Sequence, residues 1–141
     1  MSVNKSLVSK KLDFLNDQVR KIERMGFTKE FFVKEEDTHD LVVFRLQQAV
    51  ETCIDIAAHI IAQLDVPQKE TAKDAFLFLG EKEIIDESLA GRMGKAADFR
   101  NRVVHGYNNF DFNLLYEDYE DNLSDLRLFG SGILKFLESS S

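Results

Sequence analysis

Four side chains near residue 100 have types and a spacing that could perform chemistry on a phosphate. Arg100, Asn101, His105 and Tyr107 lie within eight residues of one another, where an apolar helical pattern gives way to Gly106. Arginine is a permanent planar cation that forms paired hydrogen bonds with phosphate oxygens. Histidine, whose ordinary pKa is about 6.5, can accept or release a proton near neutrality. Asn101 adds neutral hydrogen-bonding groups and Tyr107 adds a hydroxyl, so this set could bind a phosphate and move a proton beside it.

The helical spacing of these residues limits how they can act together. At about 100° per residue, Asn101 and His105 lie on one face of a helix, whereas Arg100 and His105 are about 140° apart. Arg100 and His105 therefore converge only if the helix unwinds near Gly106, if another chain completes the site, or both. A structural alternative is that Arg100 pairs with an acidic side chain and that His105 stabilises the C-terminal end of the helix, where a cation is favourable.

The charge of the chain is uneven. Its 141 residues carry a net charge of −7, which argues against a protein that coats nucleic acid nonspecifically, because such binding depends on neutralisation of phosphates by Lys and Arg. Residues 91–105 are basic, with four cations against one acid, a balance of +3. The cations are Arg92, Lys95, Arg100 and Arg102. We predict that Arg92, Lys95 and Arg102 bind substrate; the alternative is a chance cluster on a solvated face.

Composition and apolar periodicity predict an all-α fold. The chain is 44% apolar, with twelve phenylalanines, one proline and no tryptophan, which suits a helical bundle better than a loop-rich β-sandwich. We expect one domain over residues 1–138, built from five to six helices, and a disordered tail at 139–141. The expected helices cover residues 4–25, 28–36, 37–64, 71–80, 87–105 and 111–137. Thr71, Asp86 and Asp111 are expected to cap their helices, as is Asp37 or Thr38, and Gly130 with Gly132 to kink the last one.

The expected helix at 37–64 is apolar over more than half of its circumference. A helix of this kind packs on two sides. We predict that one side meets the rest of the bundle and the other meets a second copy of the protein, giving a homodimer. His59 lies on a flank of this helix and is interpreted as a structural or interface histidine.

Cysteine usage and hydropathy indicate a cytoplasmic protein without a membrane partner. Cys53 is the single cysteine, no apolar run approaches the roughly 20 residues of a membrane helix, and the N-terminus lacks the features of a signal peptide. His39 and His59 are far apart and no cysteine pair is present, so we expect no metal site. No cofactor is expected.

The segment from Phe99 to Tyr107 resembles the signature of HepT-like toxins of the HEPN superfamily. That signature is an Arg, a polar residue, three further residues, a His, one residue and a Tyr, and Arg100, Asn101, His105 and Tyr107 match each of its positions. Residues 56–61, 75–79 and 84–86 also resemble the family, and the likeness is clearest over residues 40–115.

The resemblance implies a homodimeric HEPN-type helical bundle that acts as a metal-independent endoribonuclease, the toxic half of a toxin–antitoxin pair. Carried over residue by residue, it makes Arg100 and His105 catalytic and Asn101 a supporting residue. It also implies a partner, a minimal nucleotidyltransferase antitoxin, that silences the toxin by transferring AMP to Tyr107. The RNA substrate and this antitoxin are the expected partners, and no cofactor is implied.

Two other functions are consistent with the residues. The chain could be a non-catalytic dimeric helical module that binds a nucleotidyltransferase or a nucleotide, since a fold does not by itself define an activity. The net charge of −7 favours this alternative slightly, and the intact Arg100–His105 pair disfavours it. A purely structural helical dimer leaves the basic segment 91–105 without a role.

Overall fold

The computed structural model describes residues 3–106 and 110–139, and all of the regular structure in them is helical. The helices are α1 (Lys5–Met25), α2 (Lys29–Lys34), α3 (Glu36–Gln63), α4 (Ala72–Glu81), α5 (Glu87–His105) and α6 (Phe112–Ser139). The predicted all-α fold with five to six helices is therefore confirmed. Tyr107 and the last two residues of the predicted tail lie outside the described residues, and α6 continues to Ser139, two residues beyond its expected end.

Short polar side chains begin most of the helices. The side chains of Asn4, Thr28, Thr71, Asp86 and Asp111 each accept a hydrogen bond from the backbone N–H three residues later, at 3.0 to 3.4 Å. Each of these bonds satisfies a backbone donor that has no partner within its helix.

The start of α3 differs from the expectation. The predicted cap at Asp37 or Thr38 is wrong, because the N-cap is Glu35, which makes no side-chain capping bond. The helix begins at Glu36 with two carboxylates, Glu36 and Asp37, in its first turn. Negative charges at this position interact favourably with the positive end of the helix dipole and take the place of a capping bond.

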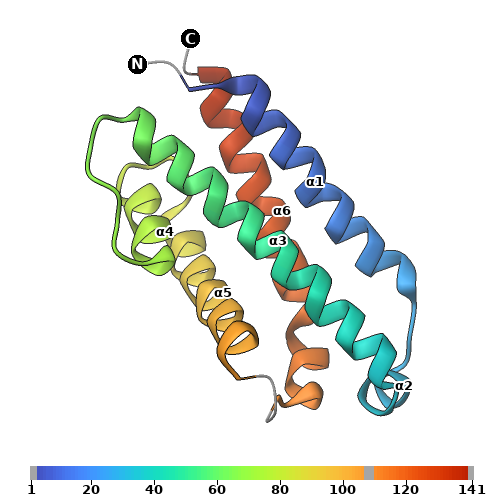
Figure 1. Ribbon diagram of the computed structural model, residues 1–141. Coiled ribbons are helices and arrows are strands. Elements are labelled where there is room, and N and C mark those ends of the chain that lie inside the picture. The colour runs from blue at the N-terminus through green and yellow to red at the C-terminus, as the bar shows by residue number, and fades with distance from the viewer. Residues whose placement is uncertain (1–2, 107–109, 140–141) are drawn as a thin grey trace.

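Helix α3 is the centre of the bundle. It contacts all five other helices, and α1 and α6 run beside it while α4 and α5 lie on one side (Figure 1). Its buried residues include Leu46, Val50, Cys53, Ala57 and Ile60. Most of the broad apolar surface of α3 is thus covered within one chain, while Leu41 and Phe44 on the same helix stay exposed. That α3 also meets another copy stays a prediction.

The crossing of α4 and α5 is close enough to require small residues. A Cβ atom placed on Gly80 would lie 2.6 Å from the Cβ of Ala90, and one on Gly94 would lie 3.1 Å from the Cγ of Lys73. Gly94 therefore lies at a close helix crossing. Gly91, in contrast, is exposed with no atom near its Cβ position.

Close packing, rather than the expected kink, accounts for the presence of glycine at positions 130 and 132. Helix α6 continues through both of them without a break. A Cβ on Gly130 would come within 3.7 Å of Leu15 on α1, and one on Gly132 within 3.3 Å of Ile85 in the α4–α5 connection. Both glycines lie where other parts of the chain pack closely against α6.

Candidate functional site

Arg100 is oriented by the central helix. Its Nη1 donates to the Oε1 of Glu51 on α3, at 3.0 Å, and the two side chains are 23% and 36% exposed. The Nε of Arg100 is buried and has no hydrogen-bond partner among the residues that the structure describes. One nitrogen of the guanidinium is therefore held by a carboxylate, and Nε is enclosed by the protein without a partner of its own.

The position of Glu51 could not be inferred from the sequence. It lies 49 residues before Arg100, and nothing in its neighbourhood distinguishes it from the other polar residues on the flank of α3. The pair corresponds to what the structural alternative expected, an arginine paired with an acid. It is equally what a phosphate-binding arginine needs, because a long side chain loses less conformational entropy on binding when it is already ordered.

His105 and Asn101 are exposed on a different face of α5 from Arg100. His105 is the last residue of the helix, and the N–H of Gly106 donates to the Arg102 carbonyl oxygen at 2.9 Å. The helix is continuous from Arg100 to His105, so the separation of about 140° between them persists. Gly106 has a φ of −176°, an extended conformation that any residue can adopt. Unwinding therefore does not bring the two residues together, and completion of the site by another chain stays a prediction.

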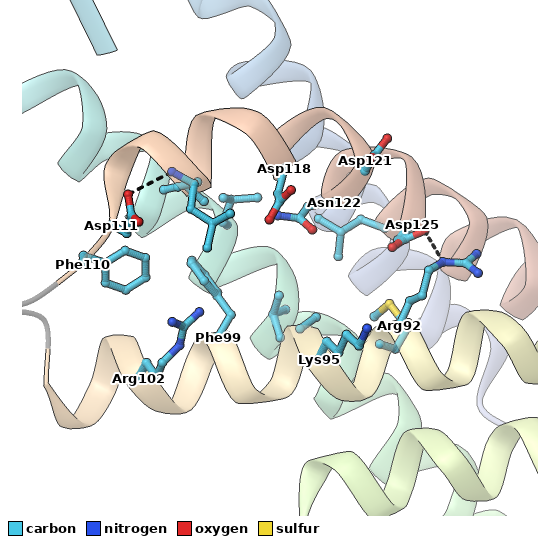
Figure 2. A pocket seen from close by; sticks show the side chains of 17 residues that line it. Arg92, Lys95, Phe99, Arg102, Phe110, Asp111, Asp118, Asp121, Asn122 and Asp125 are labelled. Carbon is cyan, nitrogen blue, oxygen red and sulfur yellow. Dashed lines mark hydrogen bonds and ion pairs between the residues drawn. The ribbon is translucent and has the colours of Figure 1, made fainter. Parts of the chain in front are cut away.

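The other three cations of the basic segment point toward α6. Arg92 forms an ion pair with Asp125, with 2.8 Å between Nε and Oδ1, and also donates to Ser88. The guanidinium of Arg102 lies over the ring of Phe110, 5.3 Å from its centre. Together with Lys95 they line a cavity between α5 and α6 (Figure 2). The structure thus separates these three candidates from Arg100, and their predicted role in substrate binding is not tested.

The cavity between α5 and α6 has an apolar floor and charged walls. Its volume is about 320 Å³, and Phe99 projects into it from α5 while Asp118 and Asn122 lie opposite on α6 (Figure 2). Three further acidic side chains stand on the α6 wall: Asp111, Asp121 and Asp125. The sequence predicts the basic wall but not the acidic one, since the two walls are far apart along the chain.

An aromatic cluster fixes the start of α6. His39 is buried and stacks on Phe112 with 3.6 Å between ring centres, and the Nδ1 of His39 lies 3.0 Å from the Phe32 carbonyl oxygen. Phe32 in turn packs against Tyr116 and Tyr119. Burial raises the pKa of Tyr119 above its ordinary value. This cluster joins α2, α3 and α6, so it holds one end of the connection between α5 and α6.

Within the described part of the chain, no three His, Cys, Asp or Glu side chains gather in a way that could hold a metal ion. Among the same residues, no helix combines the length and the apolar character needed to cross a membrane. His59 is half-buried on α3, with its Nε2 buried and without a hydrogen-bond partner among these residues.

An all-helical bundle with an Arg–His motif at the end of a long helix defines the class of HEPN-type helical domains. The family model described as "Ribonuclease HepT-like" matches residues 15–132. The chain therefore belongs to the HepT-like ribonuclease family, and the resemblance drawn from the motif is confirmed.

Two characterised relatives carry the family name. The chain is 24% identical over 123 residues to the mRNA nuclease HepT of Shewanella oneidensis, covering 87% of this chain and 92% of that protein. It is 34% identical over 77 residues to the tRNA nuclease HepT of Aphanizomenon flos-aquae, covering 54% of this chain and 52% of that one.

Solved structures with this fold superpose on nearly the whole chain. The tri-AMPylated Shewanella oneidensis HEPN toxin, in complex with the MNT antitoxin, superposes with a TM-score of 0.84 at 24% identity, covering 91% of this chain and 96% of that one. The Bacillus subtilis protein YutE, a cytosolic protein of unknown function, superposes with a TM-score of 0.85 at 18% identity, covering 99% and 94%. At these identities the likeness establishes the fold, and the predicted HEPN-type bundle is confirmed.

Proposed function

We propose that the protein is the toxin of a toxin–antitoxin pair and acts as an endoribonuclease that requires no metal ion. The observation that carries this proposal is the intact Arg100–His105 motif at the end of α5 in a chain of the HepT-like ribonuclease family. Its two named relatives are an mRNA nuclease and a tRNA nuclease, which supports RNA as the substrate.

The chemistry of the motif suits RNA cleavage. His105, exposed at the helix end, moves a proton at the 2′-hydroxyl or at the leaving oxygen of the RNA. Arg100 stabilises the negative charge that develops on the phosphoryl group during transfer. Asn101 supports His105 from the same face of the helix, four residues away. Lys95 and Arg102, with Arg92 at the far end of the same wall, contribute positive charge that holds the RNA backbone.

The active site is shared between two copies of the chain. Arg100 and His105 point about 140° apart on an unbroken helix, so one copy alone does not direct both at the same phosphate. A two-fold axis that brings the ends of two α5 helices together would place the Arg100 of one copy beside the His105 of the other. The functional unit is therefore a homodimer.

Control of the toxin is exerted through Tyr107, two residues after His105. A minimal nucleotidyltransferase antitoxin transfers AMP from ATP to the Tyr107 hydroxyl, and the added bulk and negative charge exclude the RNA phosphate. The AMP groups on the Shewanella oneidensis toxin in its complex with the MNT antitoxin support this form of regulation.

Cleavage in excess EDTA tests the proposal. Wild-type protein is expected to cleave RNA under these conditions, while Arg100→Ala and His105→Ala lose most of the activity yet keep their helical content and their dimeric mass by light scattering. Activity that disappears with the chelator, or that survives both substitutions, would contradict the mechanism. A monomer at micromolar concentration would contradict the shared site.

The proposed control has a separate test. Incubation with the nucleotidyltransferase, ATP and magnesium is expected to modify Tyr107 and to abolish cleavage, while Tyr107→Phe stays active and is not silenced. Modification at Tyr116 or Tyr119 instead would refute the control model and leave the nuclease proposal standing.

A second candidate function is a non-catalytic module that binds the nucleotidyltransferase. The ion pair between Arg100 and Glu51 favours it, because this arginine already has a structural partner. Wild-type protein that forms the complex but cleaves no RNA, with or without the antitoxin, would support the module and exclude the nuclease.

A further inference from the structure

We propose that the cavity between α5 and α6 is a subsite for a nucleobase of the bound RNA. The inference rests on the proposed ribonuclease function and deepens it, because it assigns the feature that would select among RNA sequences. The roles proposed for Arg100 and His105 concern the phosphate and its proton, and neither role distinguishes one base from another.

The shape and lining of the cavity suit a flat aromatic ring. It encloses about 320 Å³ over a floor that includes Leu46, Val50 and Met93. Phe99 and Phe110 both line it and meet edge to face, with 5.5 Å between ring centres and an angle of 85°. Proteins that bind single-stranded RNA stack bases on aromatic side chains, and such a base is unstacked from its neighbours and available to enter a cleft.

The cavity lies close enough to His105 for a single nucleotide to reach both. Arg102 precedes His105 by three residues, so the two lie about 4.5 Å apart along the helix axis and about 60° apart around it. Arg102 also lines the cavity and covers Phe110. Around the helix, His105 is therefore followed by Arg102 and then by Phe99, both of which line the cavity. A phosphate at His105 would place its sugar beside Arg102 and its base toward Phe99.

The charges of the two walls would direct the phosphate of a nucleotide to the α5 wall and its base to the α6 wall. Among the residues that the structure describes, Asp118 and Asp121 on α6 have no ion-pair partner, whereas Asp125 is neutralised by Arg92. Free carboxylates repel phosphate, so the backbone is confined to the α5 side of the cavity. The same carboxylates and the amide oxygen of Asn122 accept hydrogen bonds from the amino groups of a base. Adenine and cytosine carry such a group and uracil does not.

A basic protein segment is the other occupant that an acidic wall could attract. Two observations favour a base. The opposite wall carries Lys95 and Arg102, which would repel a basic segment. The aromatic pair Phe99–Phe110 stands at the end of the cavity nearest the motif, where a base attached to the scissile phosphate would arrive.

The test compares the binding of short RNA oligomers of adenosine, cytidine or uridine with that of a ribose-phosphate oligomer without bases. Fluorescence anisotropy is measured in the His105→Ala background, so that the RNA stays intact. The oligomer without bases reports the contribution of the backbone charges alone. We expect adenosine and cytidine oligomers to bind about 5- to 100-fold more tightly than this oligomer, with uridine between them.

Variants of the cavity assign the effect to it. Phe99→Ala is expected to remove most of the difference between base-bearing and base-free oligomers. Asn122→Leu, a change on the opposite wall that leaves the aromatic pair intact, is expected to remove the preference for adenosine and cytidine over uridine. The matched control is Phe14→Ala on α1, a half-exposed phenylalanine that does not line the cavity, and it is expected to change neither.

The results separate this inference from the proposed activity. Folded Phe99→Ala and Asn122→Leu proteins that keep the wild-type discrimination would overturn the base subsite, even if cleavage by wild-type protein still depends on Arg100 and His105. Equal binding of all oligomers, or binding of none of them, would overturn it as well. Base-dependent binding that is lost in Phe99→Ala would uphold the subsite even if the protein proves unable to cleave RNA.

Discussion

Replacement of Glu51 distinguishes two roles for its contact with Arg100: orienting a catalytic arginine, or merely neutralising its charge. The carboxylate of Glu51 accepts from Arg100 Nη1 at 3.0 Å, with both side chains partly exposed. If Glu51 positions Arg100 for a phosphate, its loss lowers the rate of RNA cleavage. If the carboxylate only neutralises Arg100 and competes with the phosphate, its loss raises the affinity for RNA. The two roles predict opposite signs.

The expected magnitude follows from the contact. Both side chains of this ion pair are partly exposed, and exposed ion pairs contribute about 0–1 kcal/mol, so Glu51→Gln, which keeps an acceptor for Arg100, should reduce the free energy of unfolding by less than about 1 kcal/mol. An unrestrained arginine side chain has about 2 kcal/mol of rotamer entropy that must then be lost when it binds the phosphate. Since about 1.4 kcal/mol corresponds to a tenfold change in rate, Glu51→Ala should lower kcat/KM by roughly 10- to 30-fold, and Glu51→Gln by less.

The assay is cleavage of a short fluorescent RNA, with kcat and KM determined separately. Partial rescue by Glu51→Gln relative to Glu51→Ala is expected, because the amide retains an acceptor for Arg100. Asp55→Asn is the matched control. Asp55 lies four residues further along α3 and pairs with Lys11 on α1 at 3.7 Å, away from the motif, so its replacement should leave cleavage unchanged.

Three results would refute this reasoning. The first is a folded Glu51→Ala protein that cleaves RNA as fast as the wild type while Arg100→Ala is inactive. The second is an increase in kcat/KM in Glu51→Gln, which would make the carboxylate a competitor of the phosphate. The third is an equal loss of activity in Asp55→Asn, which would attribute the effect to the stability of α3.

Two further predictions concern the packing of the bundle. Gly80→Ala should lower the free energy of unfolding by about 1–2 kcal/mol in urea, because the added Cβ would lie 2.6 Å from that of Ala90 and must force α4 away from α5. Gly91→Ala, on the exposed side of α5, should instead raise it by about 0.5–1 kcal/mol through helix propensity, and the same sign in both variants would contradict the packing described for this crossing. Cys53 is fully buried, and burial raises the pKa of its thiol. A thiol reagent at neutral pH should therefore label Cys53 only when denaturant unfolds the protein, and rapid labelling of the folded protein would disprove its placement in the core.

The sequence by itself determined the helices and the identity of the motif. The helical spacing of apolar residues and the capping hydrogen bonds both act over three or four residues. Thr71, Asp86 and Asp111 therefore predicted the starts of α4, α5 and α6 correctly. The start of α3 was predicted wrongly, because its N-cap Glu35 makes no side-chain capping bond. The acidic side chains of Glu36 and Asp37 in the first turn stabilise the positive end of the helix dipole instead. The motif was identifiable because its four residues are close together along the chain.

The tertiary structure alone decided what each helix face meets. Periodicity shows that a face of α3 is apolar but not which neighbour covers it, and here five helices of the same chain contact α3. The partner of Arg100 is 49 residues away and the partner of Arg92 is 33 residues away, so both pairs depend on how helices cross. The same crossings divide the basic segment, directing Arg100 toward α3 and Arg102 toward α6. Local propensity has no information about such crossings, since they result from the packing of whole faces against one another.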